Sequence, residues 1–253
     1  MSHAAAQVAA GAAFALGAAL LAARYRLGLA RPLLTAAARA ALQLAAVGAL
    51  VALVFRVPAL AVAFVAVMVV TATITSGGRL RALPGARRAA AVAIALPALA
   101  ATGILLAVGA FAATPRAAIP TAGILIGGAM TATTLTGRRL LEALASGGDE
   151  LETRLALGDA ARTALAPFTR QAITTGLVPA IDQTRSVGLV TLPGTFVGLL
   201  LGGASPAEAA RVQLTVLLAL LAVELVSAVV IAELIARAWI APGERIVAPG
   251  RAR

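Results

Sequence analysis

Long stretches without a charged residue recur along this chain, and they constrain its fold more than any other feature. Hydrophobic residues make up 61% of the 253 positions, whereas an ordinary soluble domain holds about 45–50%. A helix needs roughly 20 apolar residues to cross the hydrocarbon core of a bilayer. Five stretches of that length carry no charge, namely residues 4–23, 57–78, 89–115, 117–137 and 186–207. The sequence therefore predicts an all-α, polytopic bundle in a membrane.

Two further apolar stretches are interrupted by charge. Residues 32–55 contain Arg39, and residues 212–240 contain Glu224, Glu233 and Arg237. Both are long enough to span a bilayer. We therefore predict about seven transmembrane helices, in one permease domain that takes in residues 1–253.

The number of arginines alternates between high and low in the successive connections that join these stretches. The second, fourth and sixth connections hold one arginine each, whereas the first, third and fifth connections and the C-terminal segment hold several. Positive charge in short loops is retained on the cytoplasmic side. This pattern predicts an external N-terminus and a cytoplasmic C-terminus in a bacterial inner membrane. A cleaved signal peptide at residues 4–23 is the alternative, which the lack of positive charge before that stretch disfavours.

Several functions are excluded by composition. The chain has no Cys and no Lys, and its only His is His3. A Cys/His zinc site, a Ser-His triad and a Walker-type phosphate loop therefore all lack a necessary residue. We predict no cofactor in this chain. The net charge is +11, and the arginines that give rise to it lie mainly between the apolar stretches. This position indicates contact with anionic lipid headgroups and not with nucleic acid.

A polar segment at residues 138–175 is predicted to form a cytoplasmic insert. It holds a short helix, a turn at Gly158 and a second helix through Arg170. The spacing of Glu152 and Gly158 resembles the coupling loop of ABC-transporter permeases, whose short helix docks on the ATPase subunit. The resemblance implies that Glu152, Leu155, Gly158, Arg162 and Arg170 form the docking surface. A solvated helical hairpin is the alternative.

A wider set of motifs resembles the FetB-like family of ABC permeases. The motifs are Arg39-x3-Gln43, Ile119-Pro120, Pro179-x2-Asp182-x2-Arg185 and Leu192-Pro193-Gly194. The resemblance implies a permease that dimerises and works with two copies of a separate ATPase, which binds ATP and Mg. Members of the family are associated with bacterial iron export and with aluminium tolerance in plants.

Two positions depart from the family pattern. Thr195-Phe196 stands where the family has Met-Met, and Gly127-Gly128 stands where it has Gly-Asn. Thioether sulfur and amide oxygen are both plausible metal contacts. The sequence therefore assigns no metal ligand, and it leaves the substrate and the transport direction open.

Ionisable groups inside spans are expensive and mark transport pathways or paired structural sites. The candidates are Arg39 with Gln43 on one helix face, Asp182 with Arg185 as an ion pair beside the coupling segment, and Glu224. For each, a structural role is the alternative. Pro193-Gly194 is predicted to break the sixth span, which could line a pathway or simply kink.

Two rival functions remain open. An ion gradient acting through Glu224 would drive a secondary transporter or channel without an ATPase. An intramembrane enzyme would have to rely on Asp182, and no second Asp is placed to pair with it.

Overall fold

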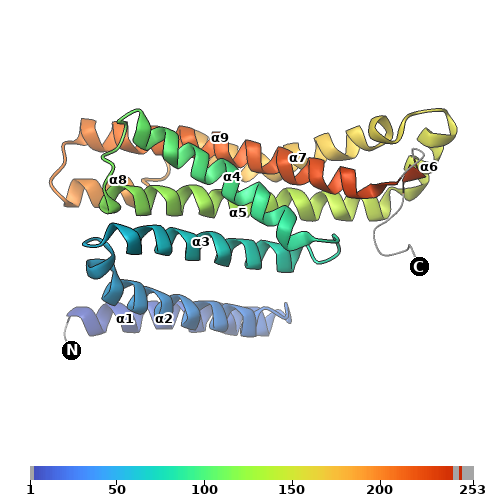
Figure 1. Cartoon of the computed structure of the whole chain (residues 1–253). Coiled ribbons are helices and arrows are strands. Elements are labelled where there is room, and N and C mark those ends of the chain that lie inside the picture. Colours follow the sequence, from blue (N-terminus) through green and yellow to red (C-terminus); the bar gives the residue numbers. More distant parts are fainter. Residues whose placement is uncertain (1–2, 242–244, 247–253) are drawn as a thin grey trace. The chain divides into compact units, whose positions relative to one another are not determined.

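The computed structural model describes residues 3–241 and 245–246, and most of them are helical. Within that part of the chain, nine helices precede a two-stranded antiparallel ladder (Figure 1). The elements are α1 His3–Arg24, α2 Ala30–Val54, α3 Pro58–Arg79, α4 Ala86–Ala107, α5 Pro115–Ser146, α6 Gly148–Ala156, α7 Ala161–Ser186, α8 Gly194–Leu201, α9 Pro206–Trp239, β1 Ile240–Ala241 and β2 Arg245–Ile246.

The chain divides into two compact units, residues 1–60 and 61–253. In the first unit, α1 packs against α2, and the turn between them uses positive φ angles at Arg26 and Gly28. Small residues such as Gly11 and Ala38 line a hollow along this hairpin. Whether the two units act as a single permease domain stays a prediction.

The second unit is built around α5 and α9. These two helices pack along each other, and α4 and α7 each contact both of them. Fully buried side chains such as Leu125, Leu140, Ile231 and Ile235 fill the space between the helices. The helix α3 joins the same core, because the Thr134 hydroxyl donates a hydrogen bond of 3.0 Å to the Ser76 hydroxyl.

Residues at the N-termini of α5 and α9 favour the start of a helix at these positions. Pro206 occupies the first turn of α9, and the Ser205 side chain accepts a hydrogen bond of 3.2 Å from the Glu208 backbone N–H. Proline at the first helical position and serine before it are favourable at a helix N-terminus. Pro115 begins α5 in the same way.

Six of the described helices are long and apolar enough to cross a membrane. They cover Ala5–Arg24, Ala30–Val51, Ala59–Arg79, Ala86–Ala107, Pro115–Ser146 and Pro206–Trp239. These agree with six of the seven predicted spans. The seventh long helix is α7, with 26 residues, which is too polar to be recognised by composition.

The predicted sixth span at residues 186–207 is wrong. The helix α7 ends at Ser186, a bridge joins Val187 to Thr191, and α8 has only 8 residues. An eight-residue helix is about 12 Å long, well short of the roughly 30 Å hydrocarbon core. The apolar run is interrupted because Gly188 and Gly203 adopt positive φ angles and Pro193 precedes α8. The long helix that runs back along α5 and α9 at this point in the chain is α7 (Figure 1).

The polar segment at residues 138–175 is not a separate insert. Residues 138–146 continue α5, and residues 161–175 belong to α7. Only residues 147–160, with α6, connect the two long helices. The 32 residues of α5 span about 48 Å, so one end of this helix extends beyond the hydrocarbon core.

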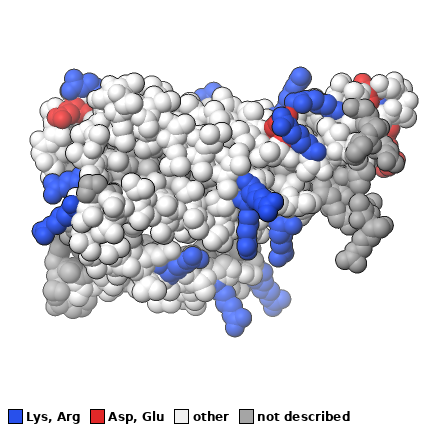
Figure 2. Space-filling view, in the orientation of Figure 1, with Lys and Arg blue, Asp and Glu red and all other residues white. Residues whose placement is uncertain are grey.

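Charged side chains lie mainly toward the two ends of the second unit. Figure 2 shows that the middle of its visible face is largely uncharged. One end of the unit carries most of the arginines. They lie in the turn between α3 and α4, at the C-terminal end of α5 and on α6. Arg116 and Arg211 lie near the N-terminal ends of α5 and α9, at the other end of the unit.

Candidate transport and coupling sites

A buried carboxylate lies where α5, α7 and α9 meet. Glu224 of α9 is only 8% exposed. It lines a cavity of about 50 Å³ together with Thr131 of α5 and Gln183 of α7. The other lining residues are Ala132, Leu135, Gly176, Leu177, Pro179 and Ala180. Carboxylate, amide and hydroxyl oxygens therefore converge on one small space within the bundle.

A glycine makes room for this carboxylate. A Cβ at Gly128 would lie 2.9 Å from Glu224 Oε1 and would overlap the Leu220 side chain. Carbon cannot approach an oxygen that closely without displacement. Gly128 is also one of the positions at which the chain departs from the family pattern, so this departure falls directly beside Glu224.

No hydrogen bond or ion pair engages the Glu224 carboxylate within residues 3–241 and 245–246. Nearby on the same helix, the Ser227 hydroxyl is fully buried and also lacks a partner. Unpaired acids at membrane depth mark proton or cation pathways. Among the described residues, no three His, Cys, Asp or Glu side chains are placed to hold a metal ion together, so a cation at Glu224 would depend on neutral oxygens for its other ligands.

Neither Asp182 nor Arg185 of α7 lines this cavity. Arg39 and Gln43 share one exposed face of α2, as predicted. Asp182 and Arg185 form the predicted ion pair, with 4.0 Å between Oδ1 and Nη1.

The predicted position of that ion pair beside the coupling segment is wrong. Asp182 lies 21 residues beyond Ala161 along α7, about 30 Å from the end that carries α6. The pair therefore sits near the opposite end of the helix, because α7 continues through the region predicted to be a cytoplasmic insert.

Pro193 and Gly194 do not break a span. Pro193 has an extended backbone and caps α8, and Gly194 is the first residue of that helix. The pair thus ends the loop after α7 and starts a short helix that packs on α9.

The predicted coupling residues gather around the turn between α6 and α7. Leu151 is buried and Leu155 is half-buried, and both pack against the ends of the long helices. Glu152 and Arg170 are exposed. Gly158 has a φ of +96°, which side chains other than glycine rarely adopt.

An ion-pair cluster ties this turn to α9. Arg162 Nη2 lies 2.6 Å from Glu233 Oε1, and Arg237 Nε donates to the same oxygen over 3.1 Å. The Arg162 side chain is 72% exposed, so the pair adds little to stability. The pair connects the start of α7 to the helix that carries Glu224.

Sequence reasoning missed Glu233 and Leu157 as site residues. Glu233 could have been found from its position one turn before Arg237, but its pairing with Arg162 joins residues 71 positions apart. Leu157 is 82% exposed at the turn after α6.

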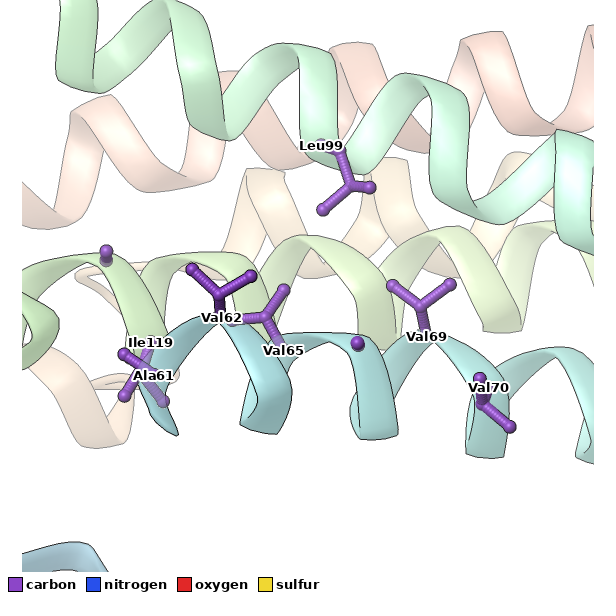
Figure 3. A pocket seen from close by; sticks show the side chains of 9 residues that line it. Ala61, Val62, Val65, Val69, Val70, Leu99 and Ile119 are labelled. Carbon is purple, nitrogen blue, oxygen red and sulfur yellow. The ribbon is translucent and has the colours of Figure 1, made fainter. Parts of the chain in front are cut away.

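A larger hollow between α3, α4 and α5 has a different chemistry. Its volume is about 430 Å³. Figure 3 shows Val65 and Val69 of α3 on one side and Leu99 of α4 on the other. Every lining side chain is aliphatic. This hollow suits a hydrocarbon chain and offers no ligand to a cation.

Comparisons with known proteins agree with a membrane bundle. The model of the "Uncharacterised protein family (UPF0014)" matches residues 5–240. The chain is 39% identical to UPF0014 membrane protein STAR2 of Oryza sativa subsp. japonica over 206 residues, which are 81% of this chain and 72% of that protein. No solved structure shows a significant match.

Two bacterial relatives are similar over more of their length. UPF0014 membrane protein YjkA of Bacillus subtilis (strain 168) is 28% identical over 223 residues, 87% of this chain and 89% of that protein. "Probable iron export permease protein FetB" of Escherichia coli (strain K12) is 28% identical over 213 residues, 83% and 82% of the two chains. Together with the six apolar helices, these names confirm the prediction of a multi-pass helical membrane protein.

Proposed function

Because this chain belongs to the UPF0014 family, we propose that it is the permease subunit of an ABC transporter that exports metal ions. A separate ATPase subunit binds ATP and Mg and supplies the energy. The arginine-rich end of the bundle, which carries α6, faces the cytoplasm in a bacterial inner membrane. The name of the FetB relative supports the transport of iron.

The observation that carries this proposal is the construction of the α6 turn. The short helix is anchored by Leu151 and Leu155 and leaves Glu152 and Leu157 exposed. The Arg162–Glu233 pair then links the turn to α9. Motion of a docked ATPase would therefore move α7 and α9 together. Glu224 lies nine residues before Glu233, about 14 Å along the same helix.

The direct test is reconstitution with the cognate ATPase. The two proteins should co-purify, and ATP hydrolysis in lipid nanodiscs should rise when the transported metal is added. Iron, aluminium and other cations would be compared in turn. Failure of every candidate ATPase to bind the chain would refute the proposal.

A second function is favoured by one specific observation. Glu224 is buried and unpaired among the described residues, as expected for a secondary transporter driven by an ion gradient. Purified chain in liposomes separates the two functions. Uptake or release by this chain alone, driven by a gradient and independent of ATP, would favour the secondary transporter.

Leu157→Glu is expected to weaken binding of the ATPase. The leucine side chain is 82% exposed, so its replacement disturbs no packing inside the chain, whereas burial of a leucine in a docking groove contributes about 1.5–3 kcal/mol. Co-purified ATPase should fall sharply while thermal stability stays unchanged. Leu201→Glu, at an equally exposed leucine of α8, is the matched control and should bind ATPase normally. Equal binding by both variants would remove Leu157 from the interface.

Glu224→Gln is expected to reduce transport without reducing stability. Glutamine keeps the shape of the side chain and removes the carboxylate, and a buried group without a partner does not stabilise the fold. The metal concentration for half-maximal transport should rise by about tenfold, which corresponds to about 1.4 kcal/mol of lost binding. Ser227→Ala, one turn away, serves as the control. Normal transport by Glu224→Gln would assign Glu224 a purely structural role.

A further inference from the structure

The exposed face of α7 is polar and charged over much of its length. The residues that define the α7 face are Arg170, Gln171, Thr174, Val178, Asp182 and Arg185, and all of them are exposed. The exposed positions in the middle of the other long helices of this unit are uncharged and mostly aliphatic. Examples are Val70 on α3, Leu96 on α4, and Leu218 and Val226 on α9, which are 45–61% exposed.

Lipid cannot cover the α7 face at low free energy. Gln183 lines the cavity that holds Glu224, so its neighbours Asp182 and Arg185 on α7 lie at the depth of Glu224 in the bundle. A charged side chain near the centre of a span costs about 2.5–3.5 kcal/mol on insertion scales. Aliphatic faces on α3, α4 and α9 avoid this penalty, and the α7 face does not. A polar or protein neighbour must therefore cover it.

The spacing along this face is that of a helix–helix contact. Exposed residues recur at positions 163, 167, 170, 174, 178, 181 and 185. Steps of three and four keep these residues on one side of a helix and are typical of a seam between two helices.

The charged residues on this face can pair with the same residues of a second copy of the chain. Asp182 and Arg185 are three residues apart, and their side chains are 64% and 78% exposed. In a twofold interface, residue i of one copy meets residue j of the other, and j meets i. Two α7 helices related in this way can exchange their ion pairs, so that each Asp182 faces the other copy's Arg185.

We propose that the α7 face binds a second copy of this chain, with the two α7 helices side by side at the twofold axis. This inference rests on the proposed function in one respect, that the permease works as a dimer. Asp182 and Arg185 of both copies then form a polar seam between the two helices, shielded from lipid.

Single cysteines test the proposal in membranes, because the chain has no natural Cys. Thr174→Cys, Val178→Cys and Ile181→Cys would each be oxidised without the ATPase and run on a non-reducing gel. At least one should form a disulfide-linked dimer. Val226→Cys is the matched control, because Val226 is exposed on α9. Val226 lies 13 residues before Trp239, the last residue of α9, and Thr174 lies 13 residues after Ala161, the first residue of α7. It should stay monomeric.

Two results would overturn the inference. No dimer at any of the three α7 positions would mean that residues 1–60 or water cover this face. Equal dimer formation by Val226→Cys would mean that the disulfides form through random collisions between chains in the membrane. Neither result depends on ATPase binding, so failure of this interface is distinguishable from failure of the proposed function.

Charge exchange between copies supplies the second measurement. Asp182→Arg and Arg185→Asp each place like charges on the α7 face and should lose self-association in a pull-down with two affinity tags. Co-expression of the two variants should restore association between them, because the arginine introduced in one copy then faces the aspartate introduced in the other. An ion pair confined to one chain cannot be rescued by a second copy, and absence of rescue would contradict the twofold arrangement.

Discussion

Replacement of Gly158 by valine is expected to abolish metal-stimulated ATP hydrolysis in the complex with the ATPase. Gly158 joins α6 to α7 with a φ of +96°, and a β-branched residue in such a conformation is strained by at least about 1–3 kcal/mol. No other atom lies within 4 Å of the added Cβ, so the strain acts on the backbone of the turn. Relief of that strain should move α6 away from its docking position.

The control for this experiment lies at the other end of α7. Gly188 has a φ of +88° and equally open surroundings, so Gly188→Val carries the same kind of backbone strain far from α6. Hydrolysis would be measured for both variants at equal protein levels. Loss in both would indicate general destabilisation, and normal hydrolysis by Gly158→Val would remove the coupling role from this turn.

Replacement of Gly176 by alanine is expected to destabilise the bundle. Alanine is normally favoured over glycine inside a helix by about 1 kcal/mol. At Gly176, however, the new Cβ would overlap Thr136 Oγ1 and lie 3.1 Å from the Thr136 backbone nitrogen. A backbone atom in α5 cannot move aside as a flexible side chain can, and overpacking costs about 1–3 kcal/mol. The overlap should outweigh the gain in helix propensity.

Thermal unfolding in detergent measures the effect. Gly127→Ala is the matched control, because Gly127 lies inside α5 and a Cβ there meets no atom within 4 Å. The two substitutions should shift the midpoint in opposite directions, downward at Gly176 and upward at Gly127. An upward shift at Gly176 would mean that α5 and α7 do not approach each other as closely as described.

Agreement between sequence and structure was best where a span is uniformly apolar. The helices α3 and α4 follow the predicted stretches 57–78 and 89–115 to within several residues at their ends. Composition suffices there because lipid, the solvent for these helices, selects on average hydrophobicity.

The error at the sixth span has a physical reason. Residues 186–207 are apolar and uncharged, but average hydrophobicity does not register the positive φ angles of Gly188 and Gly203. The helix α7 carries Arg170 and Gln171 near its middle. These polar residues lower its mean hydropathy, so composition alone does not identify it as part of a membrane bundle. Contact with α5 and α9 places it in the bundle all the same.

The sequence by itself determined that the chain is a helical membrane protein with most of its arginines between its apolar stretches, and that Glu224 is exceptional. Each of these depends on the local preference of residues for lipid or water. Only the tertiary structure decided which helix lies at the sixth position, that Thr131 and Gln183 line one cavity with Glu224, and that Arg162 pairs with Glu233. These depend on contacts between residues far apart in the chain, and such contacts are set by helix packing and not by local composition.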